Sequence, residues 1–507
     1  MTQTQQRPTP TREPHTSWVL AVLLAAQFMA NVDTAIVNVA TPSIHAGLRA
    51  SGGALELVVS GYILAYAMLL ITGARLGDLR GYRRVFLGGL GLFTLASLAC
   101  GLAPTALVLI IARVVQGVGA ALMVPQVLSG IQLHFAGPAR VRALGWYAVA
   151  LSGGAVAGQV LGGALLSANL SGSGWRPIFL INVPIGLVLM AAALRVLPAD
   201  PGGRPRRLDL WGVATLSAAV LLAILPLILG RDQGWPVWTW VSLAASLPAL
   251  GLFIAVERRV AARGGSPLIT LSVLTRPAVA WGLGALAAAT STYFALLFIL
   301  ALYLQQGLGR GPLYSGLAMV SWVAAFGIAG PFLRRLPARR LPLVAPGGCL
   351  ILAAAYLGLS ASLLTGHPAG PLLIVLLGVG GFGLGANFSG LIAHLTTSVP
   401  TRYVPDMSGL ITTTSQLAAV AGVATFGTAY LSLAPHPGPH PAMHAFTLIT
   451  AVFALTALLA AAAAYQSYRA TQRPSISSAT GDMAGRPDAA GRQQTITTPL
   501  VPEQSTL

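Results

Sequence analysis

The sequence has no lysine, two cysteines and only 12 acidic residues in 507 positions. A phosphate-binding loop needs a lysine, so the absence of that residue argues against ATP as the energy source for this chain. Cys100 and Cys349 both lie in apolar segments, and neither a disulfide framework nor a metal site is expected. All of the basic charge is carried by arginine, and the net charge is +18.

Charged residues make up only 8% of the sequence, whereas 55% of it is hydrophobic. A chain of this composition cannot form a soluble globule, and its continuous apolar runs of about 20 residues are typical of membrane-spanning helices. The strands of a transmembrane barrel would instead show apolar and polar residues in alternation. The arginines do not gather into one basic patch, so no nucleic acid is expected as a partner; the partner is the lipid bilayer. The predicted fold class is an all-α polytopic membrane protein.

Fourteen apolar segments are long enough to span a membrane. They are residues 17–39, 54–72, 85–103, 106–128, 141–166, 177–196, 210–229, 238–256, 279–304, 313–332, 343–363, 371–395, 407–431 and 444–465. The polar first 16 residues precede a run of full length, which favours a retained first helix over a cleaved signal peptide.

The arginines predict which side each loop faces. Nearly all of them lie on one side of this fourteen-span arrangement, and only Arg49, Arg176, Arg231 and Arg310 fall in loops on the other. Short loops rich in arginine stay in the cytoplasm. The protein is therefore predicted to be a multi-pass protein of the cell membrane with both termini cytoplasmic.

Two short arginine-rich loops, at residues 73–84 and 330–340, occupy matching places if the seventh and eighth spans are set aside. This repeat predicts two six-helix bundles with two extra helices between them. The predicted domains are a cytoplasmic segment 1–16, a first bundle 17–200, two extra helices 201–270, a second bundle 271–466 and a disordered tail 467–507.

The first of these loops reads GARLGDLRGYRR, from Gly73 to Arg84. So dense a charge cluster is predicted to form a short turn between two spans. It is either a plain orienting loop or the loop between spans two and three of the major facilitator superfamily, whose signature it resembles. That resemblance implies a conformational switch formed by Arg75, Gly77, Asp78, Arg80, Gly81, Arg83 and Arg84.

Asp33 is the only acid deep in a span of the first bundle. A carboxylate there faces a cavity, pairs with a cation, carries a proton, or makes a structural polar contact between helices. The stretch DTAIVNVATP, from Asp33 to Pro42, resembles the first-span motif of the fourteen-span drug:proton antiporters of that superfamily.

Arg113 is the only arginine well inside a span, and helical rise places it at the depth of Asp33, so that an ion pair is allowed. The run RVVQGVGAA, which includes Gln116, resembles the fourth-span motif of the same family. The resemblance implies that Arg113 assists proton transfer from Asp33; a purely structural arginine is the alternative. Glu56 is either a second protonatable group or an ordinary interfacial charge.

Gly154, Gly158 and Gly162 recur every four residues in the fifth span and predict a flat face for close helix packing. Together with Gly163 they resemble the glycine-rich gating motif of the antiporters. Gln159 stands where that motif has proline, which weakens the distinction between an exporter and an importer.

The resemblance implies a proton-coupled antiporter that exports amphiphilic drugs or antibiotics by alternating access. It implies no enzyme activity, no cofactor beyond the proton gradient, and a monomer. A dedicated exporter of one natural product or lipid precursor and a proton-coupled importer remain alternatives. The predicted substrate cavity contains Asn38, Gln116, Tyr293, Phe298, Tyr303, Trp322, Asn387 and Gln416. With one acid and many rings, it favours neutral or monocationic amphiphiles over dications.

Overall fold

The structure is a computed structural model. It describes residues 14–169, 172–198, 209–265, 267–269, 271–333, 337, 340–366, 368–400, 404–436 and 438–472. Within these ranges every regular element is helical, and fourteen helices are long and apolar enough to cross a membrane. The predicted fold class and the predicted number of spans are therefore confirmed.

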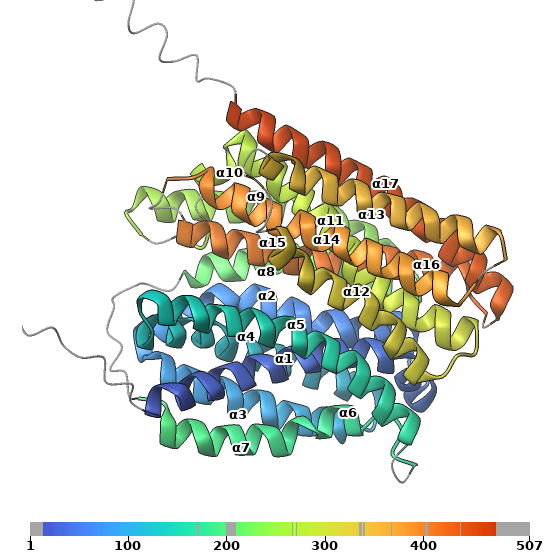
Figure 1. The fold of residues 1–507 in the computed structure, drawn as a ribbon, viewed down its shortest axis with the longest axis horizontal. Coiled ribbons are helices and arrows are strands. Elements are labelled where there is room, and N and C mark those ends of the chain that lie inside the picture. Colours follow the sequence, from blue (N-terminus) through green and yellow to red (C-terminus); the bar gives the residue numbers. More distant parts are fainter. Residues whose placement is uncertain are drawn as a thin grey trace, which may run out of the picture.

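The helices form two groups that lie side by side (Figure 1). We call the first group, α1–α7, the first half of the molecule. Its helices are α1 (Pro14–Leu48), α2 (Gly52–Arg80), α3 (Tyr82–Gly101), α4 (Ala106–His134), α5 (Gly137–Ala168), α6 (Pro177–Leu180) and α7 (Asn182–Val196).

We call α11–α17 the second half. Its elements are α11 (Pro277–Leu302), η2 (Tyr303–Gly307), α12 (Pro312–Leu333), α13 (Leu341–Leu364), α14 (Pro371–Thr397), α15 (Val404–Gly422), η5 (Val423–Gly427), α16 (Thr428–Leu433) and α17 (Pro439–Gln472). η2 and η5 are single π-helical turns that continue α11 and α15.

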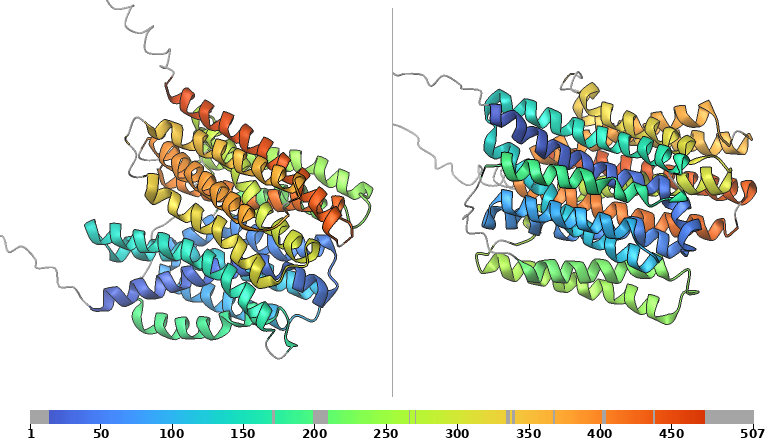
Figure 2. Two further views of the ribbon diagram at one scale, coloured as in Figure 1. Left: turned by 45° about the vertical axis from the view of Figure 1, so that its right-hand side comes forward. Right: turned by 90° about the horizontal axis from the view of Figure 1, so that it is seen from below.

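Two further helices, α8 (Leu210–Leu229) and α9 (Val237–Ala262), form a pair outside both halves, followed by the short α10 (Leu271–Leu274). The pair lies along one side of the molecule (Figure 2). It is held at both ends. Asp232 accepts a hydrogen bond from the Gly53 amide (2.9 Å), and Arg231 donates to the Leu431 carbonyl (2.7 Å). Beyond α9, the Pro267 carbonyl accepts a hydrogen bond from Arg75 (2.5 Å).

Both described ends of the chain, Pro14 and Gln472, lie at the same end of the helix bundle (Figure 1). We call this end the terminal face and the other end the opposite face. Odd-numbered spans of the chain therefore start at the terminal face, and even-numbered spans start at the opposite face.

The predicted turn at 73–84 is wrong in its extent. α2 continues to Arg80 and α3 begins at Tyr82, so only Gly81 breaks the helix. Gly81 has a φ of 89°, which glycine adopts without strain. The long arginine side chains can reach an aqueous interface from a helical backbone, so a charged sequence here does not require a loop.

Two other predicted boundaries also change. α1 extends nine residues past Val39 to Leu48, and α17 extends to Gln472, so the start of the predicted disordered tail (467–472) is helical. The tail beyond it, residues 473–507, lies outside the described residues, as do residues 1–13 and Arg334, Arg335 and Arg339 of the second arginine-rich loop.

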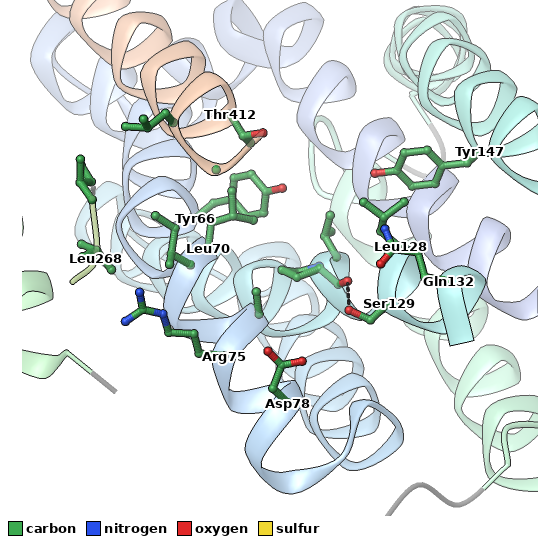
Figure 3. A pocket seen from close by; sticks show the side chains of 17 residues that line it. Tyr66, Leu70, Arg75, Asp78, Leu128, Ser129, Gln132, Tyr147, Leu268 and Thr412 are labelled. Atoms are coloured by element: carbon green, nitrogen blue, oxygen red, sulfur yellow. Dashed lines mark hydrogen bonds between the residues drawn. The ribbon is translucent and has the colours of Figure 1, made fainter. Parts of the chain in front are cut away.

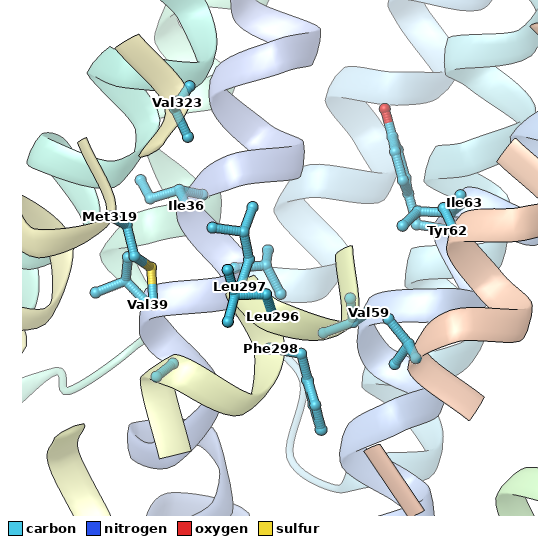
Figure 4. Packing of buried hydrophobic residues seen from close by; sticks show 14 of the residues in the cluster. Ile36, Val39, Val59, Tyr62, Ile63, Leu296, Leu297, Phe298, Met319 and Val323 are labelled. Atoms are coloured by element: carbon cyan, nitrogen blue, oxygen red, sulfur yellow. The ribbon is translucent and has the colours of Figure 1, made fainter. Parts of the chain in front are cut away.

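The two halves meet through an apolar layer near the opposite face. Figure 4 shows Ile36 and Val39 of α1 with Val59 of α2, beside Leu297 of α11 and Met319 of α12. All five side chains are buried. This layer joins the halves on the side of the molecule away from the terminal face.

Candidate functional site

A buried ion pair joins α1 to α4. Nη1 of Arg113 lies 2.6 Å from Oδ2 of Asp33, and the two side chains are 1% and 0% exposed. Nε of Arg113 donates to the Val58 carbonyl (3.1 Å), and its guanidinium lies 4.3 Å from the centre of the Tyr62 ring. A charge in the membrane interior is costly unless it is paired, and here each partner neutralises the other.

Amide and hydroxyl groups complete the surroundings of Asp33. Gln116 and Asn182 each donate to Oδ1 of Asp33 at 2.8 Å, and Gln116 also donates to Ser97 (2.6 Å). Together with Arg113, three donors therefore point at one carboxylate. An ionised carboxylate only accepts hydrogen bonds, so the arrangement suits the charged form of Asp33. We call Asp33, Arg113, Gln116, Asn182 and Ser97 the Asp33 network.

The sequence predicted that Asp33 and Arg113 lie at the same depth, and the structure brings them together. Gln116, which was predicted to line the substrate cavity, instead belongs to the Asp33 network. The sequence reasoning missed Asn182 and Ser97. Their signal was weak: each is a single polar residue in an apolar run, and only the packing of α7 against α1 and of α3 against α4 and α7 shows which way it faces.

A central cavity of about 260 Å³ lies between the halves. The first half contributes Asn31 of α1 and Leu151, Ser152 and Ala155 of α5; the second half contributes Thr290, Tyr293, Phe294, Val323, Phe326, Leu384, Phe388, Ser415 and Gln416. Asp33 is not among these lining residues. Asn31 and Asp33 are two residues apart, which turns their side chains about 200° from each other around α1.

A cleft of about 340 Å³ lies between this cavity and the terminal face, among α2, α4, α5 and α15 (Figure 3). Tyr147 and Thr412 line the cleft, and Leu151 and Gln416, one helical turn further along the same two helices, line the central cavity. The two spaces therefore follow one another along a path from the terminal face inward.

Hydrogen bonds join the two halves near the opposite face. Gln305 of η2 donates to the Val39 carbonyl of α1 (2.9 Å), and Thr428 of α16 donates to the carboxylate of Glu56 (3.1 Å). Glu56 is only 1% exposed, so its interpretation as an ordinary interfacial charge is wrong. It is a buried acceptor that joins α2 to the second half.

Besides Gln116, five residues of the predicted cavity lie elsewhere in this structure. Phe298, Tyr303 and Trp322 are fully buried in the packed core. Asn387 donates to the sulfur of Cys349 (2.8 Å), and Asn38 donates to the Thr34 carbonyl within α1 (3.3 Å). Composition revealed that the second half is rich in rings and amides, but the side of each helix that faces inward depends on packing. Tyr293 and Gln416 do line the cavity.

The residues of the predicted switch loop spread over three environments. Gly77 packs against Gln126 of α4, and Asp78 and Arg75 line the cleft. Arg83 donates to the Leu194 carbonyl of α7 (2.5 Å), which ties the start of α3 to the end of the first half. The remaining members, Arg80 and Arg84, are exposed, and Gly81 makes the break between the helices.

The glycine face of α5 packs on α1, as the spacing predicted. A Cβ atom on Gly154 would lie 2.8 Å from the Phe28 carbonyl oxygen, and one on Gly158 would lie 2.6 Å from that of Val32. Gly162 packs against Ile36, which is also on α1, whereas Gly163 packs against α12. These glycines let the backbones of α1 and α5 approach closely beside the central cavity.

We expect Gly158→Ala to destabilise the protein by about 1–3 kcal/mol, because the added methyl group forces α1 and α5 apart. Gly145→Ala on the same helix is the matched control, since a Cβ atom there meets open space. The measurement is the thermal unfolding midpoint of the purified variants in detergent. Equal midpoints for the two variants would show that the α1–α5 contact does not require glycine.

Comparison with known proteins places this architecture in a family. A family model described as Major Facilitator Superfamily matches residues 23–423. A probable actinorhodin transporter of Streptomyces coelicolor is 36% identical over 421 residues, which cover 82% of this chain and 72% of that protein. The cephamycin export protein CmcT of Amycolatopsis lactamdurans is 38% identical over 429 residues, covering 81% and 84%.

The methylenomycin A resistance protein of Streptomyces coelicolor is 32% identical over 435 residues, which cover 84% of this chain and 88% of that one. Among solved structures, a bacterial homologue of the human lysosomal transporter Spinster, inward-facing and occupied, has a TM-score of 0.66. The match covers 90% of this chain and 97% of the Spinster homologue. Because the two sequences are only 17% identical, it supports the fold alone. The chain belongs to the major facilitator superfamily.

Proposed function

We propose that the protein is a proton-coupled antiporter that exports amphiphilic small molecules, drugs or antibiotics among them, across the cell membrane by alternating access. As a member of this superfamily it is a transporter and not an enzyme. The names of its relatives describe a transporter for actinorhodin, an export protein for cephamycin and resistance to methylenomycin A, which support export rather than import. In this proposal the protein transports its substrate as a monomer.

One observation carries the proposal: Asp33 of the fully buried Asp33–Arg113 pair and Asn31 of the cavity wall lie on the same helix, α1. Asp33 accepts three hydrogen bonds; when it binds a proton it loses the charge that Arg113 neutralises, and its O–H becomes a donor that faces these donors. Proton binding then changes how tightly α1 is held to α4. Since α1 also lines the cavity through Asn31, the proton and the substrate act on one helix.

The terminal face is the cytoplasmic one in this proposal. The positions of the arginines support this orientation, because most of them lie at that end of the helices. The state described here then receives substrate from the cytoplasm through the cleft, with Asp33 in its charged form. Exchange to the other state opens the Gln305 and Thr428 contacts and admits a proton from outside.

The test uses the purified protein in liposomes that contain a pH-sensitive dye. Three compounds are added in turn: an uncharged anthraquinone, ethidium as a monovalent cation, and a bis-quaternary ammonium compound. We expect proton movement across the membrane with at least one of the first two, and the least with the bis-cation. If none of the three moved protons beyond the rate in protein-free liposomes, the proposed coupling would be wrong.

A further inference from the structure

The central cavity has two unlike walls. The wall from the second half is aromatic, with Tyr293 and Phe294 of α11, Phe326 of α12 and Phe388 of α14. The wall from the first half has no rings and is partly polar, with Asn31 of α1 and Ser152 of α5 beside Leu151 and Ala155. A ligand between them therefore meets ring faces from the second half only, and hydrogen-bonding groups from both halves.

The aromatic wall is held in place by further rings behind it. The ring of Tyr293 lies 5.7 Å from that of Phe326, which lies 5.7 Å from that of Phe388. Behind Tyr293, the fully buried Trp322 is stacked at 6.4 Å with an interplanar angle of 28°, and Tyr356 is stacked on Trp322 at 5.9 Å. Rings that are fixed by packing offer flat surface to a ligand with little loss of side-chain entropy.

Polar groups are available at the edge of this wall. In the described part of the protein neither the Tyr293 hydroxyl nor the Gln416 amide forms a hydrogen bond with another residue. Asn31 donates its Nδ2 to the Gln27 carbonyl (2.8 Å), which leaves its oxygen as an acceptor. These three side chains can bind hydroxyl or carbonyl groups on a ligand.

None of the described residues that line the cavity is charged. The Asp33 carboxylate is 0% exposed, accepts three hydrogen bonds and already neutralises Arg113. A cation in the cavity would thus lose its hydration and find no free counter-ion. The sequence argument counted one acid in the cavity, but Asp33 is not among the residues that line it.

We infer that the substrates are uncharged, planar aromatic molecules that carry hydroxyl or carbonyl groups along one edge. The rings lie against Tyr293 and Phe326, and the polar edge faces Asn31 and Gln416. The cavity of about 260 Å³ holds a small fused-ring system, and any larger substituent extends into the cleft toward the terminal face. This inference rests on the proposed transport function and adds the substrate class.

The test measures equilibrium binding to the purified full-length protein without a proton gradient. The probe is 1,4-dihydroxyanthraquinone. The readout is the quenching of its fluorescence when it binds to the protein. Two matched compounds are compared with it: a derivative with one trimethylammonium group, and a saturated tricyclic diketone of the same ring number. We expect both to bind about tenfold more weakly, because one loses its hydration without a counter-ion and the other loses ring stacking.

Variants locate the binding site. Tyr293→Leu and Phe326→Leu are each expected to weaken binding of the anthraquinone by about five- to tenfold, with a smaller change for the saturated diketone. Phe332→Leu is the matched control on α12, since that ring is 56% exposed and lies away from the cavity. Gln416→Leu should weaken the binding of the dihydroxyanthraquinone but not that of anthracene, because anthracene has no polar edge. Tyr293→Phe keeps the ring and tests the hydroxyl alone if Tyr293→Leu does not fold.

Equal affinities for the charged and uncharged anthraquinones would overturn the inference, as would Tyr293→Leu and Phe326→Leu variants that fold and bind like Phe332→Leu. The outcomes also separate this inference from the proposed function. Proton movement with ethidium but no binding of the anthraquinone would refute the substrate class and leave antiport standing. Binding that follows the expected pattern, without proton movement for any compound, would refute coupling and leave the substrate class standing.

Discussion

Asp33→Asn is expected to abolish substrate-driven proton movement in liposomes while the protein still binds an uncharged aromatic compound. The amide keeps the size of the side chain, and its single oxygen can still accept a hydrogen bond from either Arg113 or Asn182, but it cannot take up a proton at neutral pH. Binding persists because Asp33 faces away from the central cavity. The two measurements are proton movement with the dye-loaded liposomes and equilibrium binding in detergent.

Asp232→Asn is the matched control for this variant. Asp232 lies near the opposite face with its side chain 22% exposed, outside the Asp33 network, and is expected to retain proton movement. Undiminished proton movement in Asp33→Asn would remove this residue from the coupling mechanism. Loss of both proton movement and binding would place Asp33 in the substrate site instead, contrary to the described geometry.

Arg113→Leu is expected to destabilise the protein by about 3–5 kcal/mol, because it leaves the Asp33 carboxylate buried without a cation. The double variant Asp33→Asn with Arg113→Leu should recover most of this loss, since neither charge remains. The thermal unfolding midpoints of the parent, both single variants and the double variant form a double-mutant cycle.

The cycle distinguishes a charge effect from a packing effect. The Arg113 side chain is 1% exposed and lies against the ring of Tyr62, so its removal also leaves a space. If the double variant were no more stable than Arg113→Leu alone, packing rather than the unpaired charge would explain the loss. Recovery in the double variant would show that the pair is held together chiefly because each charge needs the other.

Local patterns in the sequence predicted much of this molecule. Apolar length predicted the fourteen spans, because a membrane requires a fixed helix length. The four-residue repeat of Gly154, Gly158 and Gly162 predicted a packing face, because such a repeat stays on one side of a helix. Helical rise predicted that Asp33 and Arg113 would lie at the same depth, and they form an ion pair.

Features that depend on the rotation of a helix about its own axis could not be predicted in this way. Phe298 and Tyr303 are as aromatic as Tyr293, yet they are buried in the core while Tyr293 faces the cavity. Similarly, the charges of residues 73–84 indicated an interface but did not show that the backbone there remains helical up to Arg80. Nearly every neighbour in these spans is apolar, so periodicity gives little information about which face is turned inward.

The helix pair α8–α9 has a consequence for molecules that arrive dissolved in the lipid. The pair covers the seam between α2 and η5 and is fastened to α2 near both faces of the membrane, by Asp232 at one end and by the bond from Arg75 to Pro267 at the other. An amphiphile that partitions into the bilayer therefore meets a barrier on that side of the protein. In the described part of the chain, no additional helix pair covers the seam between α5 and α12 on the far side. There α5 and α12 close the seam by packing directly on each other, with Gly163 of α5 against Leu313 of α12, so the two seams exclude lipid in different ways.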